Sequence, residues 1–207
     1  MHMDRRQFVK NLGLGTASLS MGSLVTASSC APSGDSSLKQ NVKEGEDGQF
    51  LFIGDDIAIA QTEYGKVQGY LLNHVYTFLG VPYGADTSGK NRFMPPQKPE
   101  PWTDVRPAVF YGNTAPQRME NRWPNNYGTF ADHWNYWDVS EDCLYLNVWT
   151  PGIADGKKRP VLVWLHGGGF TNGSGIEQDG YHGENISREG DIVFCSINHR
   201  LGPIGFS

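Results

Sequence analysis

The sequence predicts an α/β protein in which an N-terminal β-meander leads into a mostly parallel sheet. Short strand-like segments with tight turns between them fill residues 57–79. Residues 160–165 and 192–197 are instead continuously apolar, as is typical of strands buried on both faces of a parallel sheet. A short helical segment at residues 184–189 separates the two apolar runs, and the order strand, helix, strand favours a parallel pair.

The first thirty residues resemble a bacterial twin-arginine export signal and not a part of the fold. Arg5 and Arg6 precede an apolar residue and a lysine, and a modestly apolar region follows over residues 11–28. The alternative is a basic tail with a chance arginine pair. We expect residues 1–30 to direct export by the twin-arginine route to the periplasm or the cell exterior.

The cleavage site of this signal leaves two alternatives open. Small residues at 27–29 precede Cys30, as in a relaxed lipoprotein site whose cysteine carries a lipid. Ala27, however, stands where such sites usually carry leucine. Processing then yields either a lipid anchor on Cys30, which we favour, or a soluble protein cleaved among the small residues.

Residues 31–49 predict a flexible linker, and residues 50–207 the folded part. The linker is rich in Ser, Gly, Lys, Asp and Glu and nearly lacks apolar residues, so it cannot form a core. Order is expected to begin near Phe50.

The meander is expected to begin with two short strands at residues 57–61 and 64–70, joined by a tight hairpin at residues 62–63. A third strand follows at residues 75–79. Residues 92–102 are too rich in proline for regular structure, because proline fixes φ and lacks an N–H donor.

A long polar and aromatic loop is expected over residues 112–138. It contains three tryptophans, Trp123, Trp134 and Trp137. Loops of this length are usually functional or pack as a surface cover.

Residues 143–149 alternate as a strand with one face on the core and the other less buried. The helix at residues 184–189 is expected to stop at Gly190. The side chains expected to share the core face of the strand are Leu144, Leu146 and Val148.

The apolar run at residues 160–165 leads through His166 into three consecutive glycines, residues 167–169. Glycine adopts backbone angles forbidden to other residues and lets N–H groups approach a ligand closely. At the carboxyl end of a buried strand, such donors can stabilise the negative oxygen that forms when a carbonyl is attacked. The alternative is a glycine-rich turn with no chemical role.

The composition excludes several classes of function. The chain has 207 residues, with 38% hydrophobic, 19% charged and a net charge of −5, which is globular and mildly acidic. It therefore has no basic footprint for nucleic acid or an anionic membrane surface. No internal repeat or apolar stretch long enough for a mature transmembrane helix is present. We expect no cofactor and no metal ion, and membrane contact only through a lipid on Cys30.

Four segments together resemble type-B carboxylesterases, the cholinesterase-like family with the α/β-hydrolase fold. They are residues 78–84 with 92–96, residues 141–149, residues 166–169 and residues 196–206, in the family's order. The resemblance covers about residue 55 to the end of the chain. It implies that residues 50–207 are the N-terminal part of a carboxylesterase type-B domain, so that the fold is incomplete in this chain.

The resemblance implies catalytic roles for two glycines only. Gly168 and Gly169 match the family's oxyanion-hole donors, and Gly167 supports the loop. His166 matches a position that supports the glycines, and His199 is expected to be structural, because the family's catalytic histidine lies far downstream.

The resemblance implies further roles outside the glycine loop. Arg92 and Glu141 match a pair that forms a structural salt bridge. Trp134 and Trp137 lie where cholinesterase-like enzymes place an aromatic choline-binding residue, and aromatic faces bind cations. Simple packing is the alternative for both tryptophans.

The cysteines depart from the family's pattern. Cys143 matches a cysteine that many members bridge to a cysteine just before a Pro-Gln pair, but Ala115 stands at that position here. Cys195 lies in an apolar strand and is expected to be a buried thiol. We therefore expect no disulfide framework despite export.

The family's nucleophile also has no counterpart in the 207 residues. No Gly-x-Ser-x-Gly motif is present, and the resemblance places the nucleophile elbow after this region. Ser174 in Gly-Ser-Gly is expected to be a flexible loop serine. An oxyanion hole without its nucleophile retains little catalysis, so this chain alone is expected to be inactive.

Three functional hypotheses follow from the resemblance. The first is the N-terminal part of a serine carboxylic-ester hydrolase that acts on small-molecule esters. The second is a non-catalytic cholinesterase-like binding or adhesion module. The third is a truncated gene product, which would expose an apolar sheet edge and express poorly.

Overall fold

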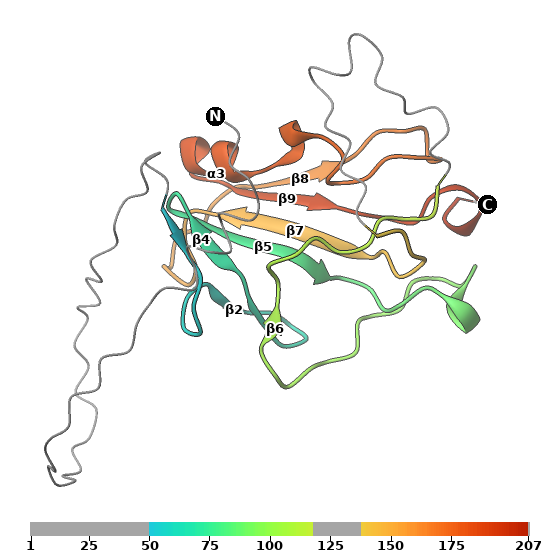
Figure 1. The fold of residues 1–207 in the computed structure, drawn as a ribbon, viewed down its shortest axis with the longest axis horizontal. Coiled ribbons are helices and arrows are strands. Elements are labelled where there is room, and N and C mark those ends of the chain that lie inside the picture. The colour runs from blue at the N-terminus through green and yellow to red at the C-terminus, as the bar shows by residue number, and fades with distance from the viewer. Residues whose placement is uncertain (1–49, 118–137, 207) are drawn as a thin grey trace, which may run out of the picture. The chain divides into compact units, whose positions relative to one another are not determined.

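A computed structural model describes residues 50–117 and 138–206 (Figure 1). Within these residues the strands form a six-stranded sheet in the order β1-β4-β5-β7-β9-β8 and a three-stranded sheet in the order β2-β3-β6. The strands are β1 (Leu51–Phe52), β2 (Ile59–Gln61), β3 (Lys66–Gln68), β4 (Tyr70–Leu72), β5 (Val75–Pro82), β6 (Arg106–Pro107), β7 (Tyr145–Thr150), β8 (Val161–Leu165) and β9 (Val193–Ile197). The helices are η1 (Gly89–Asn91), η2 (Asp179–Tyr181), α3 (Glu184–Gly190) and η3 (Gly202–Ile204).

The six-stranded sheet is mixed. Each neighbouring pair from β1 through β4, β5 and β7 to β9 is antiparallel, and β8 pairs parallel to β9. In the described ranges, the parallel part of this sheet is therefore the β8–β9 pair alone. No helix among the described residues is long and apolar enough to cross a membrane.

The predicted hairpin is present between β2 and β3, with a turn from Thr62 to Gly65. The Thr62 hydroxyl accepts hydrogen bonds from the N–H groups of Tyr64 and Gly65. The predicted single strand at residues 64–70 is instead two strands that part at Gly69. A Cβ on Gly69 would collide with the Thr77 carbonyl, so glycine lets the chain pass from the small sheet to the large one.

Strand β7 runs through the middle of the large sheet. Of the three side chains predicted to share its core face, Leu144, just before the strand, is buried at 4% exposed, but the other two are not the most buried of the strand. Asn147 and Trp149 are 2% and 1% exposed, whereas Leu146 and Val148 are only partly buried. Trp149 packs in a core cluster with Val75, Leu79 and Phe194. Both faces of β7 are covered, because Leu146 and Val148 pack on a second cluster that includes Phe78 and Val81.

Strand β8 is an edge strand, which contradicts the prediction that it is buried on both faces. All five of its residues are exposed, including Val161 at 63% and Val163 at 52%. Its only pairing in the described part of the sheet is with β9. An apolar sequence indicates that a strand is stable when buried. Whether the strand is buried depends on which elements pack against it.

Strand β9 and helix α3 form as predicted, with a shifted helix end. The middle residues of β9 are buried. Helix α3 includes Gly190 and ends at Asp191, which adopts a left-handed conformation with φ of 45°. The helix packs against β5, β7 and β9, and the Ser187 hydroxyl donates to the Trp149 carbonyl.

Candidate active site

His166 and the three glycines at residues 167–169, here called the glycine loop, directly follow the carboxyl end of β8. They line a pocket of about 370 Å³. Residues that flank η3 in the segment after β9, His199, Leu201 and Phe206, form the other wall. The lining residues are Leu165, His166, Gly167, Gly168, Gly169, Phe170, Asn172, His199, Leu201 and Phe206.

The backbone of this loop requires glycine at two positions. Gly168 and Gly169 have φ of 123° and 63°, in the range that other residues rarely adopt. A Cβ on Gly168 would collide with the Asn172 carbonyl. The Gly168 carbonyl accepts hydrogen bonds from Thr171 and Asn172, at 3.2 and 3.3 Å, which close the turn.

The N–H groups of Gly168 and Gly169 are available as donors. Within residues 50–117 and 138–206, neither has a hydrogen-bond acceptor. Two adjacent donors without acceptors on a pocket wall can bind an anionic oxygen. The assignment of these two glycines as oxyanion donors stays a prediction.

Two imidazoles stack on one another beside the glycine loop. The rings of His166 and His199 are parallel, with centroids 4.4 Å apart. The His166 Nδ1 lies 2.8 Å from the Gly167 carbonyl, and the His199 Nδ1 lies 2.9 Å from the Arg200 carbonyl. Each Nδ1 therefore donates locally, which fits the structural roles expected for both histidines.

Phenylalanines form the open side of the pocket. Phe170 and Phe206 are 65% and 51% exposed, and their ring centroids lie 4.7 Å apart. Phe206 also meets His199 edge-on. The Gly202 N–H donates to the Phe170 carbonyl at 2.7 Å, which joins η3 to the end of the glycine loop.

No described residue that lines this pocket carries a hydroxyl or a thiol. Ser174, expected to lie on a flexible loop, is 1% exposed and its Oγ accepts from the Ile176 N–H. The expectation was wrong because the Gly-Ser-Gly segment packs inward. Ser174 is therefore shielded from any substrate in the pocket.

The ion pair of Arg92 and Glu141 joins the proline-rich segment to the start of β7. The Arg92 Nη2 and Nε lie 2.6 and 2.7 Å from the two carboxylate oxygens of Glu141. This carboxylate raises the pKa of Arg92 through a hydrogen bond and its charge. Nearby, Arg200 donates to the Met94 carbonyl at 2.9 Å. Trp134 and Trp137 lie outside the described residues.

The two described cysteines, Cys143 and Cys195, are free and buried, and burial was predicted for Cys195. Ala115 and Cys143 lie in one core cluster with Leu144 and Leu201. Burial raises the pKa of Cys143 to about 12 and that of Cys195 to about 11.

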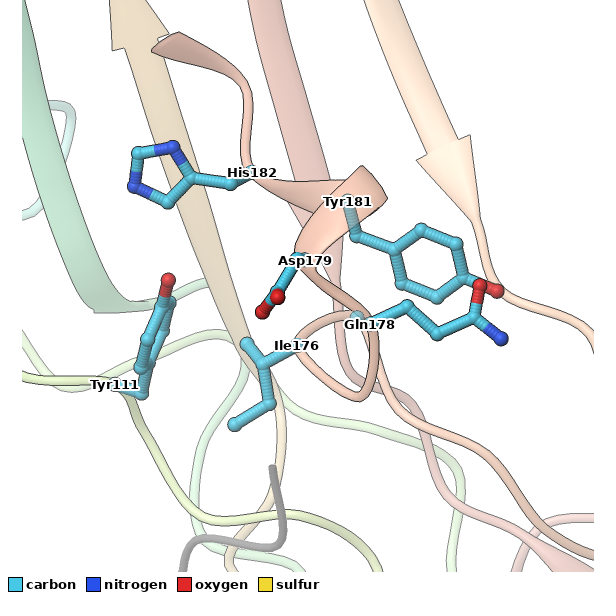
Figure 2. Close-up of a pocket in the computed structure, with 7 residues that line it drawn as sticks. Tyr111, Ile176, Gln178, Asp179, Tyr181 and His182 are labelled. Carbon is cyan, nitrogen blue, oxygen red and sulfur yellow. The ribbon is translucent and has the colours of Figure 1, made fainter. Parts of the chain in front are cut away.

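A second, smaller pocket of about 220 Å³ lies beside η2. Figure 2 shows Tyr111, Asp179 and His182 around the same space, with Gln178 and Tyr181 on the other side of the turn. Burial lowers the pKa of His182 and raises the pKa of Tyr111 to about 12. No group of His, Cys, Asp and Glu side chains suited to a metal ion occurs in the described ranges.

The chain belongs to the carboxylesterase family, whose model matches residues 56–207. Phenmedipham hydrolase of Pseudarthrobacter oxydans is 45% identical over 148 residues, which are 72% of this chain and 29% of that protein. Para-nitrobenzyl esterase of Bacillus subtilis is 39% identical over 151 residues, which are 72% of this chain and 28% of that protein.

A solved esterase from Clostridium hathewayi, described as able to hydrolyse aliphatic aromatic polyesters, has a similar fold. Its TM-score is 0.67 at 38% identity, over 76% of this chain and 30% of that one. The α/β-hydrolase fold predicted for the chain is confirmed by this likeness. The chain spans less than a third of the length of the curated relatives it matches.

Several residues that build the site were missed at the sequence level. The buried amides of Asn147 and Asn198 join neighbouring strands and loops, and Gln117 binds the loop after the glycines. The sequence did offer one signal for Asn147, which is a polar residue within an apolar strand. A buried amide needs hydrogen-bond partners, so this position could have been predicted to bind neighbouring backbone groups.

Proposed function

We propose that this chain supplies the oxyanion-hole part of a serine carboxylic-ester hydrolase. The observation that carries the proposal is the pair of donors without acceptors, Gly168 and Gly169, on the wall of the pocket. The family membership and its esterase relatives support it. Small-molecule esters are the proposed substrates.

The proposed reaction needs groups that these described residues do not provide. A serine hydroxyl attacks the ester carbonyl, a histidine takes the hydroxyl proton, and the carbonyl oxygen becomes an oxyanion. The N–H groups of Gly168 and Gly169 then bind that oxyanion. Loss of one such donor typically lowers the rate about 100- to 1000-fold.

The 207-residue chain by itself is expected to be inactive. Hydrolysis of p-nitrophenyl acetate by the purified chain is expected to equal the buffer rate, since the sequence has no Gly-x-Ser-x-Gly. Turnover that is lost after mutation of a serine in this chain would contradict this part of the proposal.

A chimera tests whether the glycine loop is competent. Residues 56–207 replace the matching segment of para-nitrobenzyl esterase of Bacillus subtilis, which supplies the remaining residues. The chimera is expected to hydrolyse p-nitrophenyl esters. A folded but inactive chimera would instead favour a non-catalytic binding module.

Two alanine variants of the chimera separate oxyanion binding from backbone strain. Gly169 and Gly156 have similar φ, 63° and 73°, and open space around a built Cβ. Gly169→Ala is expected to lower kcat at least about 10-fold because it shifts a donor. Gly156→Ala carries the same backbone strain away from the pocket and is the matched control.

We also propose that the chain is exported by the twin-arginine route and anchored through Cys30. The paired arginines Arg5 and Arg6 and the small residues before Cys30 support this. Residues 1–49 fused to a reporter are expected to export it, and replacement of both arginines by lysine to stop export. Labelling by a radioactive fatty acid that persists in Cys30→Ser would contradict the anchor.

A further inference from the structure

We infer that Gln117 is a positioning residue for the glycine loop, an inference that rests on the proposed esterase function. Its side chain binds both backbone groups of Gly173. The Gly173 N–H donates to Oε1 at 2.8 Å, and Nε2 donates to the Gly173 carbonyl at 3.0 Å. The primary amide thus pairs with one residue's backbone as a neighbouring strand would.

Gly173 in turn touches the start of the glycine loop. Its φ is 111°, and a Cβ at this position would collide with the Gly167 carbonyl and with the His166 Nδ1. The backbone of Gly173 therefore forms the surface on which the His166–Gly167 turn rests. A displacement of Gly173 is transmitted directly to that turn, and from there to the donor on Gly168.

Gln117 is also hydrogen-bonded to a residue of the hydrophobic core. The second hydrogen of the Gln117 Nε2 binds the Ala115 carbonyl at 3.1 Å. Ala115 is 2% exposed and packs with Cys143, Leu144 and Leu201. Leu201 of this cluster also lines the pocket, so the cluster that contains Ala115 extends to the pocket wall.

These contacts define the role of Gln117. At the end of the loop, the Gly202 N–H binds the Phe170 carbonyl. At its start, Gln117 binds Gly173, which touches the His166–Gly167 turn. Two donors must keep a fixed spacing to bind one oxyanion, and misplacement by about 1 Å can lower a rate about 100-fold. Gln117 restricts that displacement without itself meeting the substrate.

Gln117→Glu tests this link with almost no change of shape. The introduced carboxylate keeps an acceptor for the Gly173 N–H, but it cannot donate to the carbonyls of Gly173 and Ala115. Gln97→Glu is the matched control, since Gln97 is exposed and its Nε2 donates to the nearby Pro95 carbonyl, away from the glycine loop.

The first measurement is backbone hydrogen exchange on the full 207-residue chain. In Gln117→Glu at neutral pH, exchange at residues 166–175 is expected to rise about 10-fold, as the loss of two hydrogen bonds predicts. Strand β9 and helix α3 are expected to keep the exchange of the unmodified chain. Acidification that protonates the introduced carboxylate restores an O–H donor and is expected to restore protection.

The second measurement separates positioning from general stability. In the active chimera, Gln117→Glu is expected to lower kcat about 10-fold with KM nearly unchanged, and Gln97→Glu to change neither. Unchanged exchange at residues 166–175, or a rise spread equally over the chain, would overturn the inference. A loosened loop with unchanged kcat would also overturn it. An inactive chimera with a loosened loop would contradict the esterase proposal and leave the mechanical link intact.

Discussion

The side-chain oxygen of Asn147 in β7 accepts a hydrogen bond from the backbone N–H of Gly80 in β5, at 3.0 Å. The register of β5 against β7 shifts between Phe78 and Val81, so Gly80 lies in an irregularity of the ladder. Asn147 provides the acceptor that the ladder no longer supplies. Its Nδ2 donates in the other direction to the Ser196 hydroxyl in β9, at 3.1 Å.

Asn147→Ala is therefore expected to destabilise the fold strongly. It leaves the Gly80 N–H and the Ser196 hydroxyl without partners and opens a small cavity, which together cost about 2–4 kcal/mol. Urea unfolding followed by circular dichroism measures this loss. Asn185→Ala, at an exposed site on α3, is the control and is expected to stay within about 0.5 kcal/mol of the unmodified chain.

The three loop glycines are expected to tolerate alanine in a graded way. Gly168→Ala collides with the Asn172 carbonyl and is the most damaging. Gly169→Ala meets no atom but retains a positive φ, at a cost of about 1 kcal/mol. Gly167→Ala has neither problem and is expected to be nearly neutral. Melting temperatures that fail to follow this order would contradict the loop geometry.

Both described thiols are expected to resist modification in the folded chain. Burial raises the pKa of Cys143 to about 12 and that of Cys195 to about 11, so almost no thiolate is present at pH 8. A Cys30→Ser variant removes the remaining thiol. Its reaction with Ellman's reagent is expected to be negligible until denaturant is added, after which two thiols per chain react.

The stability of the fold is expected to fall on acidification, in part through His182. Partial desolvation of the His182 imidazole beside the Trp149 ring lowers its pKa in the folded state, although the residue keeps solvent contact. The unfolded chain therefore binds a proton more readily. The neutral imidazole contributes stability that is fully present above its unfolded pKa of about 6.5 and is lost as pH falls through the lower folded value.

Because His182 is exposed, solvent screening keeps its contribution to the unfolding free energy small. His182→Gln is expected to flatten the slope of unfolding free energy against pH below about pH 6.5. His74→Gln provides the comparison, and an identical slope in all three chains would exclude the effect.

The exposed strand β8 is expected to make the isolated chain self-associate. Its apolar side chains and unpaired described edge present a template for another strand. Val163→Lys is expected to shift the chain toward monomer in size-exclusion chromatography with light scattering. Val105→Lys, at an exposed valine outside both sheets, is expected to leave the distribution unchanged.

The sequence predicted the elements better than their surroundings. The apolar run of β9 and the hairpin after β2 rest on local patterns, and both formed. Strand β8 has an equally apolar pattern but is exposed, because burial depends on what packs against a strand. The pattern in β7 favoured Leu146 and Val148 as core, whereas the large ring of Trp149 and the amide of Asn147 took the more buried positions.

In the candidate site, too, features with a local sequence pattern were predicted and long-range contacts were not. The positive φ of Gly168 and Gly169 could be expected from the sequence, since glycine adopts backbone angles forbidden to other residues. The contact between Gln117 and Gly173 joins residues 56 positions apart, so no local pattern contained it. Ser174 resembled a flexible serine only because its neighbours are glycines, and those glycines allow the close packing that buries it.

The pairing of β8 has a consequence for how the chain folds as the ribosome makes it. Its register joins Val161 to Val193 and Leu165 to Ile197, so β8 emerges before the strand that holds it. Gly202, which fixes the Phe170 carbonyl, emerges later still. Since chains fold from the N-terminus during synthesis, the meander can assemble while the glycine loop is still without support. The pocket therefore acquires its shape after the meander, and slow translation between β8 and η3 lengthens the time for which the apolar edge is exposed to chaperones and neighbouring chains.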